Sequence, residues 1–322
     1  MNILHDGLRR VERDSRGQTW LERDLLRCLS PRLRKWLLLG LVLAFSPLPV
    51  LAGTLRTLIV QGQSNAAHDM MAGSVELKKI LESAGLFSVE FATTPAKGQD
   101  MSGFKPDFAA YDLVVVNYDG DRWPAETEAA FEKYMGNGGG MVVVHSADNA
   151  FGRWKEFNEM IGVGGWGGRT AKSGPCLRFR DGQWVALEAP GPGGSHGRPH
   201  PYVVTTRAPD HPIMQGLPAQ WLHVSDELYD RLRGPARNVT VLASAMTDPN
   251  TGGSGEEEPV LMAVTYGRGR VFHSTMGHGI SQMKCVGFIV TLQRGAEWAA
   301  TGKVTQKVPD DFPSATESRT RP

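Results

Sequence analysis

The sequence contains few cysteines and almost no net charge, and each shortage excludes a class of protein. Three cysteines in 322 residues cannot form a disulfide-rich scaffold. The 35 basic and 34 acidic residues leave a formal net charge of +1, which gives no electrostatic reason to expect a nucleic-acid partner. A composition with 41% hydrophobic and 21% charged residues is that of a globular protein and excludes a disordered or collagen-like chain.

The first 52 residues have the order of charged and apolar residues that is typical of a secretory signal. The basic cluster Arg32–Lys35 leads into the apolar run Trp36–Phe45, and a small residue follows at Ala52. The run is about half as long as a membrane-spanning helix. We therefore expect residues 1–52 to be a cleaved leader, with no stable membrane span left after cleavage and a periplasmic or secreted protein.

Removal of this leader leaves two cysteines in the chain. Export permits Cys176 and Cys285 to pair in a disulfide. Two buried free thiols are the alternative, and the sequence leaves both open.

Strands and helices alternate along the rest of the chain. Short apolar segments such as Leu113–Asn117 are typical of strands that are covered on both faces. This alternation predicts an α/β fold with a mainly parallel sheet between two helical layers. The expected strands are Leu55–Gln61, Val89–Thr93, Leu113–Asn117, Met141–His145, Tyr202–Thr205, Thr240–Ala245, Val260–Tyr266 and Arg270–Ser274. The expected helices are Ser74–Ser83, Pro124–Met135, Trp154–Ile161 and Val286–Ala300.

A long Gly/Pro-rich insertion over 162–200 interrupts this alternation. A segment of about 39 residues is too short to bury a hydrophobic core of its own without disulfides or other cross-links. We expect it to form a lid over the end of the sheet that carries His145; a surface loop that packs locally is the alternative. A flexible C-terminal tail is expected over 304–322.

Polar side chains follow several of the expected strands. His145 ends one strand, His278 follows another, and Glu227 comes after an apolar segment. Ligands of open α/β sheets bind at the carboxyl ends of the strands, so we expect these three residues in one pocket. Histidine acts as acid, base or metal ligand near neutral pH, and a carboxylate orients it or binds the same metal.

Six segments of the chain, in this order, resemble those of the ThuA-like (trehalose utilisation) family. They are Gly138–Ala147, Asp210–Pro218, Asp226–Tyr229, Tyr266–Phe272, Gly277-His278 and Gly295–Ala299. The resemblance implies a flavodoxin-like three-layer α/β/α domain over 53–303, similar to class I glutamine amidotransferases. Those enzymes carry a cysteine after the strand that here ends at His145, so the protein is not expected to be a glutaminase.

The resemblance also implies a role in carbohydrate metabolism, with a sugar or modified (keto-)sugar as ligand. We expect catalysis by acid–base chemistry, with or without one divalent metal, and the alternatives are a non-catalytic carbohydrate-binding protein and a structural partner in an envelope complex. The oligomeric state stays open. The residues expected to carry catalysis are His145, Glu227 and His278. Those expected to bind the substrate are Asn149, Trp166, Arg169, His196 and His68, and His200 is the expected metal ligand.

The leader generates the first testable prediction. N-terminal sequencing of the exported protein is expected to begin at Gly53 or within a few residues of it, because signal peptidases cut after small residues that follow the apolar core. A full-length product that stays in the cytosol would contradict the prediction.

Overall fold

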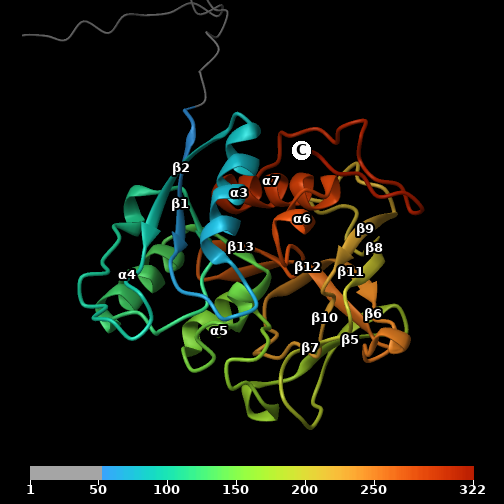
Figure 1. Cartoon of the computed structure of the whole chain (residues 1–322), viewed down its shortest axis with the longest axis horizontal. Helices are drawn as coiled ribbons and strands as arrows, with labels where there is room; N and C mark the ends of the chain where they lie inside the picture. The colour runs from blue at the N-terminus through green and yellow to red at the C-terminus, as the bar shows by residue number, and fades with distance from the viewer. Residues whose placement is uncertain (1–52) are drawn as a thin grey trace, which may run out of the picture. The chain divides into compact units, whose positions relative to one another are not determined.

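The computed structural model describes residues 53–322, and the leader expected over 1–52 lies outside the described residues. A nine-stranded sheet forms the centre of this part of the chain (Figure 1). Its strands, in sheet order, are β2 (Phe87–Thr93), β1 (Leu55–Gln61), β3 (Leu113–Val116), β4 (Gly140–Val144), β13 (Gly269–Ser274), β12 (Glu257–Tyr266), β11 (Val239–Met246), β8 (His200–Thr206) and β9 (Gln220–Asp226).

The sheet has a parallel half and an antiparallel half. Strands β2, β1, β3, β4 and β13 are parallel to their neighbours among these five. Strands β12, β11, β8 and β9 continue the sheet with antiparallel pairs. The parallel half has the strand order of flavodoxin-like folds. The α/β class that the sequence predicts is therefore confirmed.

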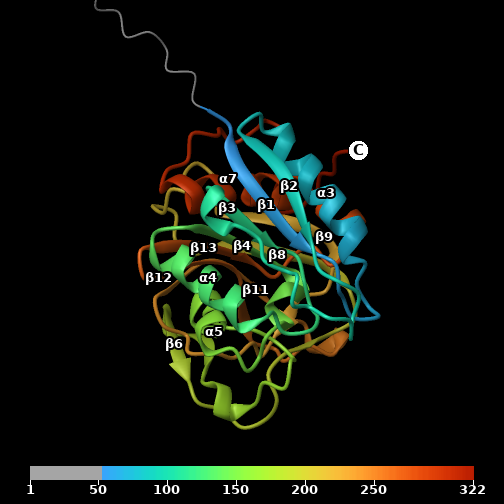
Figure 2. The same cartoon turned by 90° about the vertical axis from the view of Figure 1, so that its left-hand side faces the viewer.

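Two helical layers cover the two faces of the sheet. Figure 2 shows α3 (Met70–Ser83) and α7 (Val286–Thr301) on one side, and α4 (Ala125–Gly136) and α5 (Lys155–Ile161) on the other. A short helix, α6 (Ile280–Met283), precedes α7. No helix in the described part of the chain is long and apolar enough to cross a bilayer.

Alternating side chains of the central strands enter two separate cores. Leu58 and Val60 of β1 pack in the core that contains α4 and α5, and Ile59 packs in the core that contains α3 and α7. All three are buried. Complete burial of such a side chain contributes about 1.5–3 kcal/mol relative to exposure, which is why apolar residues occupy both faces of these strands.

Helix α3 begins earlier than the sequence predicts. The helix was expected from Ser74, but the Asp69 side chain accepts a hydrogen bond from the Ala72 N–H at 2.9 Å and caps a helix that starts at Met70. The Asn117 side chain at the end of β3 donates to the Met70 carbonyl at 2.9 Å. These bonds hold the loop after β1 close to the carboxyl ends of the strands.

The insertion over 162–200 contains short strands of its own. Strands β5 (Cys176–Arg180) and β6 (Gln183–Leu187) form a hairpin, and β7 (Ser195–His196) pairs with β10 (Tyr229–Asp230). Figure 1 shows these strands grouped together at the lower right. The pairing with β10 attaches the end of the insertion to the segment that follows Glu227.

The C-terminal residues 304–322, expected to form a flexible tail, are bound along the domain instead. The Val286 N–H donates to the Arg319 carbonyl at 2.8 Å, and the Leu222 N–H donates to the Ser314 carbonyl at 2.7 Å. The Phe312 ring packs against Trp221 at a centroid distance of 5.6 Å. The polar, Pro-rich composition of this segment does not reveal that the edge strand β9 and the start of α7 offer it backbone partners.

Both cysteines of the described chain are buried free thiols. Cys176 begins β5, and Cys285 lies just before α7. The sequence leaves open whether Cys176 and Cys285 form a disulfide, and in the structure they are unpaired.

The packing of the C-terminal segment generates a second prediction. Truncation after Lys303 removes the Phe312 contact and the backbone bonds, and it is expected to destabilise the domain by about 2–4 kcal/mol. Differential scanning calorimetry is expected to show a melting temperature lower by several degrees. An unchanged melting temperature would contradict this packing. Deletion of the last two residues only is a matched control, expected to have a much smaller effect.

Candidate functional site

Four side chains from distant parts of the sequence meet at the carboxyl ends of the strands. His68 follows β1, His145 follows β4 and His278 follows β13, so the three parallel strands place them at one edge. Glu227 follows β9 in the antiparallel half. One nitrogen or carboxylate oxygen of each residue lies within 4.8 Å of those of the others. We call these four residues the His/Glu cluster.

His145 occupies a sharp turn between β4 and the 3₁₀ segment His145–Asn149. Its φ of 45° is in the left-handed region, which a residue with a side chain adopts at a cost of about 1–3 kcal/mol. Its Nδ1 lies 2.7 Å from the Thr275 carbonyl, which accepts a hydrogen bond from it. Nδ1 is therefore a donor nitrogen of this ring, and Nε2 lies on the side of the Glu227 Oε2, 3.6 Å away.

His68 is held in the same tautomer by a different partner. Its Nδ1 lies 2.7 Å from the Asn65 Oδ1, an oxygen that can only accept. Its Nε2 is buried and has no hydrogen-bond partner. Burial, together with the neighbouring His145 and His278, lowers the pKa of His68 from 6.5 to about 4. The ring is therefore neutral at physiological pH.

Glu227 connects the histidines of the cluster. Its Oε2 lies 3.1 Å from the His278 Nδ1, 3.6 Å from the His145 Nε2 and 3.7 Å from the His196 Nε2. Burial alone would raise the pKa of the Glu227 carboxyl, but its contacts with His145 and His278 outweigh burial and lower it well below its usual range. The same contact raises the pKa of His278.

The buried carboxylate of Asp226 positions two members of the cluster. Its Oδ1 accepts hydrogen bonds from the backbone N–H groups of Glu227 (2.8 Å) and His278 (3.3 Å). Its Oδ2 accepts from the Gly277 N–H at 2.8 Å and from the His223 Nε2 at 3.0 Å. Burial by itself would lower the pKa of His223, but the bond to Asp226 raises it to about 9. Asp226 thus joins the end of β9 to the loop after β13.

A cavity of about 370 Å³ opens beside the cluster. The insertion contributes Trp166 and His196 to its wall, and the Trp166 ring packs against Tyr229 at a centroid distance of 4.8 Å. The Oδ1 of Asn149 is buried at this wall without a partner. Asp119 also lines the cavity, and burial raises the pKa of its carboxyl. If the insertion forms a lid over the end of the sheet that carries His145, as the sequence predicts, Trp166 and His196 are expected to line this cavity, and both do.

A second hollow of about 270 Å³ lies on the other side of His68. His145, His278 and Asn117 line it together with residues of α6. Since His68 lines both hollows, the cluster lies between them and is reached from each.

Two residues predicted for the site have other positions in the structure. Arg169 is 2% exposed, and its guanidinium donates to the Asn158 side chain and to the carbonyls of Asn149, Ala150 and Gly165 at 2.6–3.0 Å. It therefore supports the insertion from inside, and it does not line the cavity beside the His/Glu cluster.

His200 is the second correction. It is not a member of the His/Glu cluster, because its Nδ1 binds the Arg198 carbonyl at 2.9 Å and its ring packs against Tyr202 at 6.0 Å. The third histidine of the cluster is His68, from the loop after β1, which the sequence predicts as a substrate-binding residue.

Sequence reasoning missed several residues that shape the site. Asp226 stands beside the predicted Glu227, Asn65 follows the first strand closely, and Asp119 follows the third. Their common signal is a polar side chain just after an apolar strand. That signal alone does not distinguish a residue that holds another side chain from one that faces solvent.

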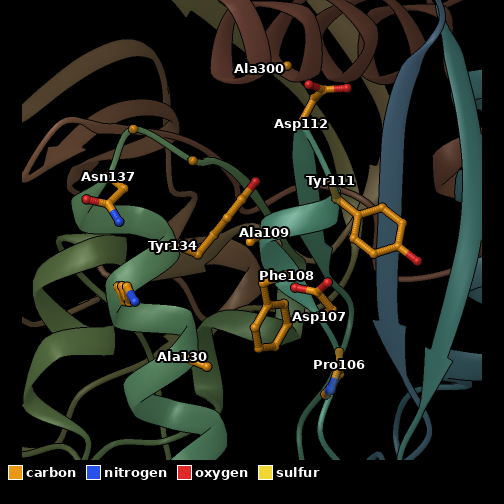
Figure 3. A pocket seen from close by; sticks show the side chains of 13 residues that line it. Pro106, Asp107, Phe108, Ala109, Tyr111, Asp112, Ala130, Tyr134, Asn137 and Ala300 are labelled. Carbon is orange, nitrogen blue, oxygen red and sulfur yellow. The ribbon is translucent and has the colours of Figure 1, made fainter.

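A larger cavity, of about 500 Å³, lies away from the cluster (Figure 3). Asp112, Gly138 and Gly139 place it before β3 and β4, at the amino ends of the strands. Figure 3 shows Tyr111, Asp112 and Tyr134 around it. None of its lining residues is a histidine or cysteine, whereas His68 and His196 line the cavity beside the His/Glu cluster.

The interior position of Arg169 generates a third prediction. Arg169→Met removes four hydrogen bonds and leaves buried carbonyls without donors, so it is expected to destabilise the domain by about 3 kcal/mol or more. Urea unfolding measures this loss. Arg198→Met, an exposed arginine of the same insertion, is the control and is expected to change stability by less than about 0.5 kcal/mol. A stable Arg169→Met variant with impaired ligand binding would favour the substrate role.

Comparison with known proteins identifies the family. The family model ThuA, described as trehalose utilisation, matches residues 56–299. A ThuA-like protein of Parabacteroides merdae is 50% identical, with a TM-score of 0.81 over 83% of this chain and 98% of that chain. A ThuA-like protein of Bacteroides uniformis shares the fold at 19% identity, with a TM-score of 0.54 over 81% of this chain and 97% of that chain. None of the curated proteins matches the chain. This chain therefore belongs to the ThuA family.

Proposed function

We propose that this protein is an exported enzyme that acts on a sugar or keto-sugar by acid–base chemistry at the His/Glu cluster. The observation that carries the proposal is the convergence of three histidines and one carboxylate beside a cavity with an aromatic wall, which His68 and Glu227 line. Membership of the trehalose utilisation family supports a carbohydrate as the ligand.

The cavity has the parts that a sugar needs. The half-buried Trp166 offers an aromatic surface to the apolar face of a sugar ring. The Asn149 Oδ1, buried and without a partner, is an acceptor for a hydroxyl group, and binding would relieve the cost of leaving it unpaired. His196, with 34% of its side chain exposed, adds a further donor or acceptor at the rim.

The cluster provides the groups for proton transfer. Because the Nδ1 proton of His145 is held by the Thr275 carbonyl, its Nε2 is free to accept a proton from a hydroxyl or from the carbon beside a keto group. The Glu227 carboxylate, 3.6 Å away, stabilises the positive charge that then forms on the ring. His278 lies 3.3 Å from His145 and is placed to return the proton.

The cysteines support a reaction other than glutamine hydrolysis. The turn after β4 carries His145 where glutamine amidotransferases carry their nucleophile. Cys176 and Cys285 are buried elsewhere in the fold and lie outside the His/Glu cluster. A thiolate mechanism therefore has no nucleophile at this site.

The test begins with a thermal-shift screen of sugars and keto-sugars on residues 53–322. For a ligand that stabilises the protein, Trp166→Ala is expected to weaken binding about tenfold or more, equivalent to about 1.4 kcal/mol, because the ring loses its stacking surface. Calorimetric titration measures the affinity. Trp184→Ala is the matched control, since Trp184 lies in the β5–β6 hairpin of the same insertion and does not line the cavity.

A further variant separates catalysis from binding. His145→Gln is expected to retain the ligand and to abolish its conversion, followed by NMR of the sugar. A ligand that binds the unaltered protein and is never converted would favour the non-catalytic carbohydrate-binding protein. Equal binding by the Trp166→Ala and Trp184→Ala variants would contradict the proposed sugar site.

A further inference from the structure

We propose that His68, His145, Glu227 and His278 bind one divalent transition-metal ion of the zinc type. The inference concerns the same cluster as the proposed function, but it does not depend on the ligand being a sugar. It changes the chemistry of the site, because the ion and an oxygen bound to it would then take over the polarising and proton-accepting roles.

The hydrogen bonds that His68 and His145 make outside the cluster use the Nδ1 of each ring and leave its Nε2 as the acceptor nitrogen. The Thr275 carbonyl fixes the proton of His145 on Nδ1, and the Asn65 Oδ1 does the same for His68. Both Nε2 atoms therefore point lone pairs at the same place. Histidines that bind metals are held in this way, with the second nitrogen donating to a carbonyl or carboxylate oxygen.

Two features of the cluster favour a cation between its members. The His145 Nε2 lies 3.6 Å from the Glu227 Oε2, too far for a direct hydrogen bond, and a shared cation would link the two atoms. The Nε2 of His68 is buried with no hydrogen-bond partner, which costs about 1–3 kcal/mol. A metal ion satisfies all of these electron pairs at once.

The spacing of the donor atoms suits such an ion. Tetrahedral ligands at about 2.0–2.2 Å from zinc lie roughly 3.3–3.6 Å from one another. The His278 Nδ1 is 3.3 Å from the His145 Nε2 and 3.1 Å from the Glu227 Oε2, and the Glu227 Oε2 is 3.6 Å from the His145 Nε2. Three imidazoles and one carboxylate are a donor set that suits zinc and its neighbours among the transition metals.

The surroundings favour binding and access. Asp226 holds the backbone of both Glu227 and His278, so two of the four ligands are oriented before the ion arrives. The hollows on either side of His68 let the ion enter and leave one side open to a water or sugar oxygen. The His196 Nε2 lies 3.7 Å from the Glu227 Oε2, so a fourth histidine borders the cluster without being a member of it.

The experiment measures metal binding directly and needs no substrate. Residues 53–322, free of any affinity tag and stripped with a chelator, are titrated with Zn²⁺ in a calorimeter, and metal content is measured by mass spectrometry. One ion per chain is expected, together with a higher melting temperature. Co²⁺ in place of Zn²⁺ is expected to give the visible absorption of a four- or five-coordinate ion.

Variants locate the site. His68→Gln and Glu227→Gln are each expected to weaken Zn²⁺ binding about a hundredfold or more, while circular dichroism shows that they fold. Asn65→Ala, which releases the His68 ring, is expected to weaken it about tenfold. His200→Ala is the matched control, a histidine outside the cluster, and is expected to bind as the unaltered protein does.

The outcomes separate this inference from the proposed function. Folded protein that binds no stoichiometric Zn²⁺, or that loses it in His200→Ala and not in Glu227→Gln, overturns the metal site. Sugar binding by chelator-stripped protein that takes up no metal would leave the acid–base proposal standing. Zn²⁺ binding at the cluster with no response to any sugar or keto-sugar would overturn the carbohydrate proposal alone.

Discussion

The carboxylate of Asp226 joins the two halves of the sheet at the point where the site forms. Two of its four hydrogen bonds, from the N–H groups of Gly277 and His278, tie the end of β9 in the antiparallel half to the loop that follows β13 in the parallel half. The other two come from His223 and Glu227 on its own segment. This connection holds the backbone of Glu227 next to that of His278. An ionised group with four N–H donors tolerates burial because each donor replaces the water that the carboxylate loses.

The insertion completes the cavity from the opposite direction. Its end pairs with β10, and this places Trp166 and His196 next to Tyr229. Gly194 allows the close approach, because a Cβ at its position would lie 2.7 Å from the Trp166 ring. Arg169 stabilises the start of the insertion by donating hydrogen bonds to the carbonyls of Asn149, Ala150 and Gly165. The insertion thus contributes the side chains of Trp166 and His196 to the cavity wall, and the side chain of Arg169 holds it in place.

The metal and carbohydrate proposals describe one arrangement. An ion in the His/Glu cluster would lie between the two hollows, and a sugar against Trp166 would present hydroxyl or keto oxygens to its open side. Several acceptor groups face this edge of the sheet, where they favour positively charged or hydrogen-donating partners. They are the Nε2 atoms of His68 and His145, the ionised Glu227 carboxylate and the unpartnered Asn149 oxygen. A bound ion and a polyhydroxyl ligand supply them.

Local patterns in the sequence determine the fold class and the place of the site. Apolar strands such as β3 and β4 are recognisable because residues on both faces are buried, and a polar residue that follows such a strand stands at the carboxyl edge. His145, His278 and Glu227 were found on this basis. Trp166 and His196 stood out as unusual residues in a Gly/Pro-rich segment, and the structure places both at the cavity.

Only the tertiary structure decided which of these polar residues meet. Arg169 and His200 carry polar side chains of the kind predicted for the site, yet carbonyl oxygens enclose Arg169 and His200 packs on Tyr202. His68 reaches the His/Glu cluster because the loop after β1 is held against α3. The segment 304–322 packs along the domain because β9 and α7 offer it backbone partners. Such contacts join residues far apart in sequence, and their side-chain directions depend on packing. Periodicity along the chain reports burial and strand ends, but it carries no information about which ends come together.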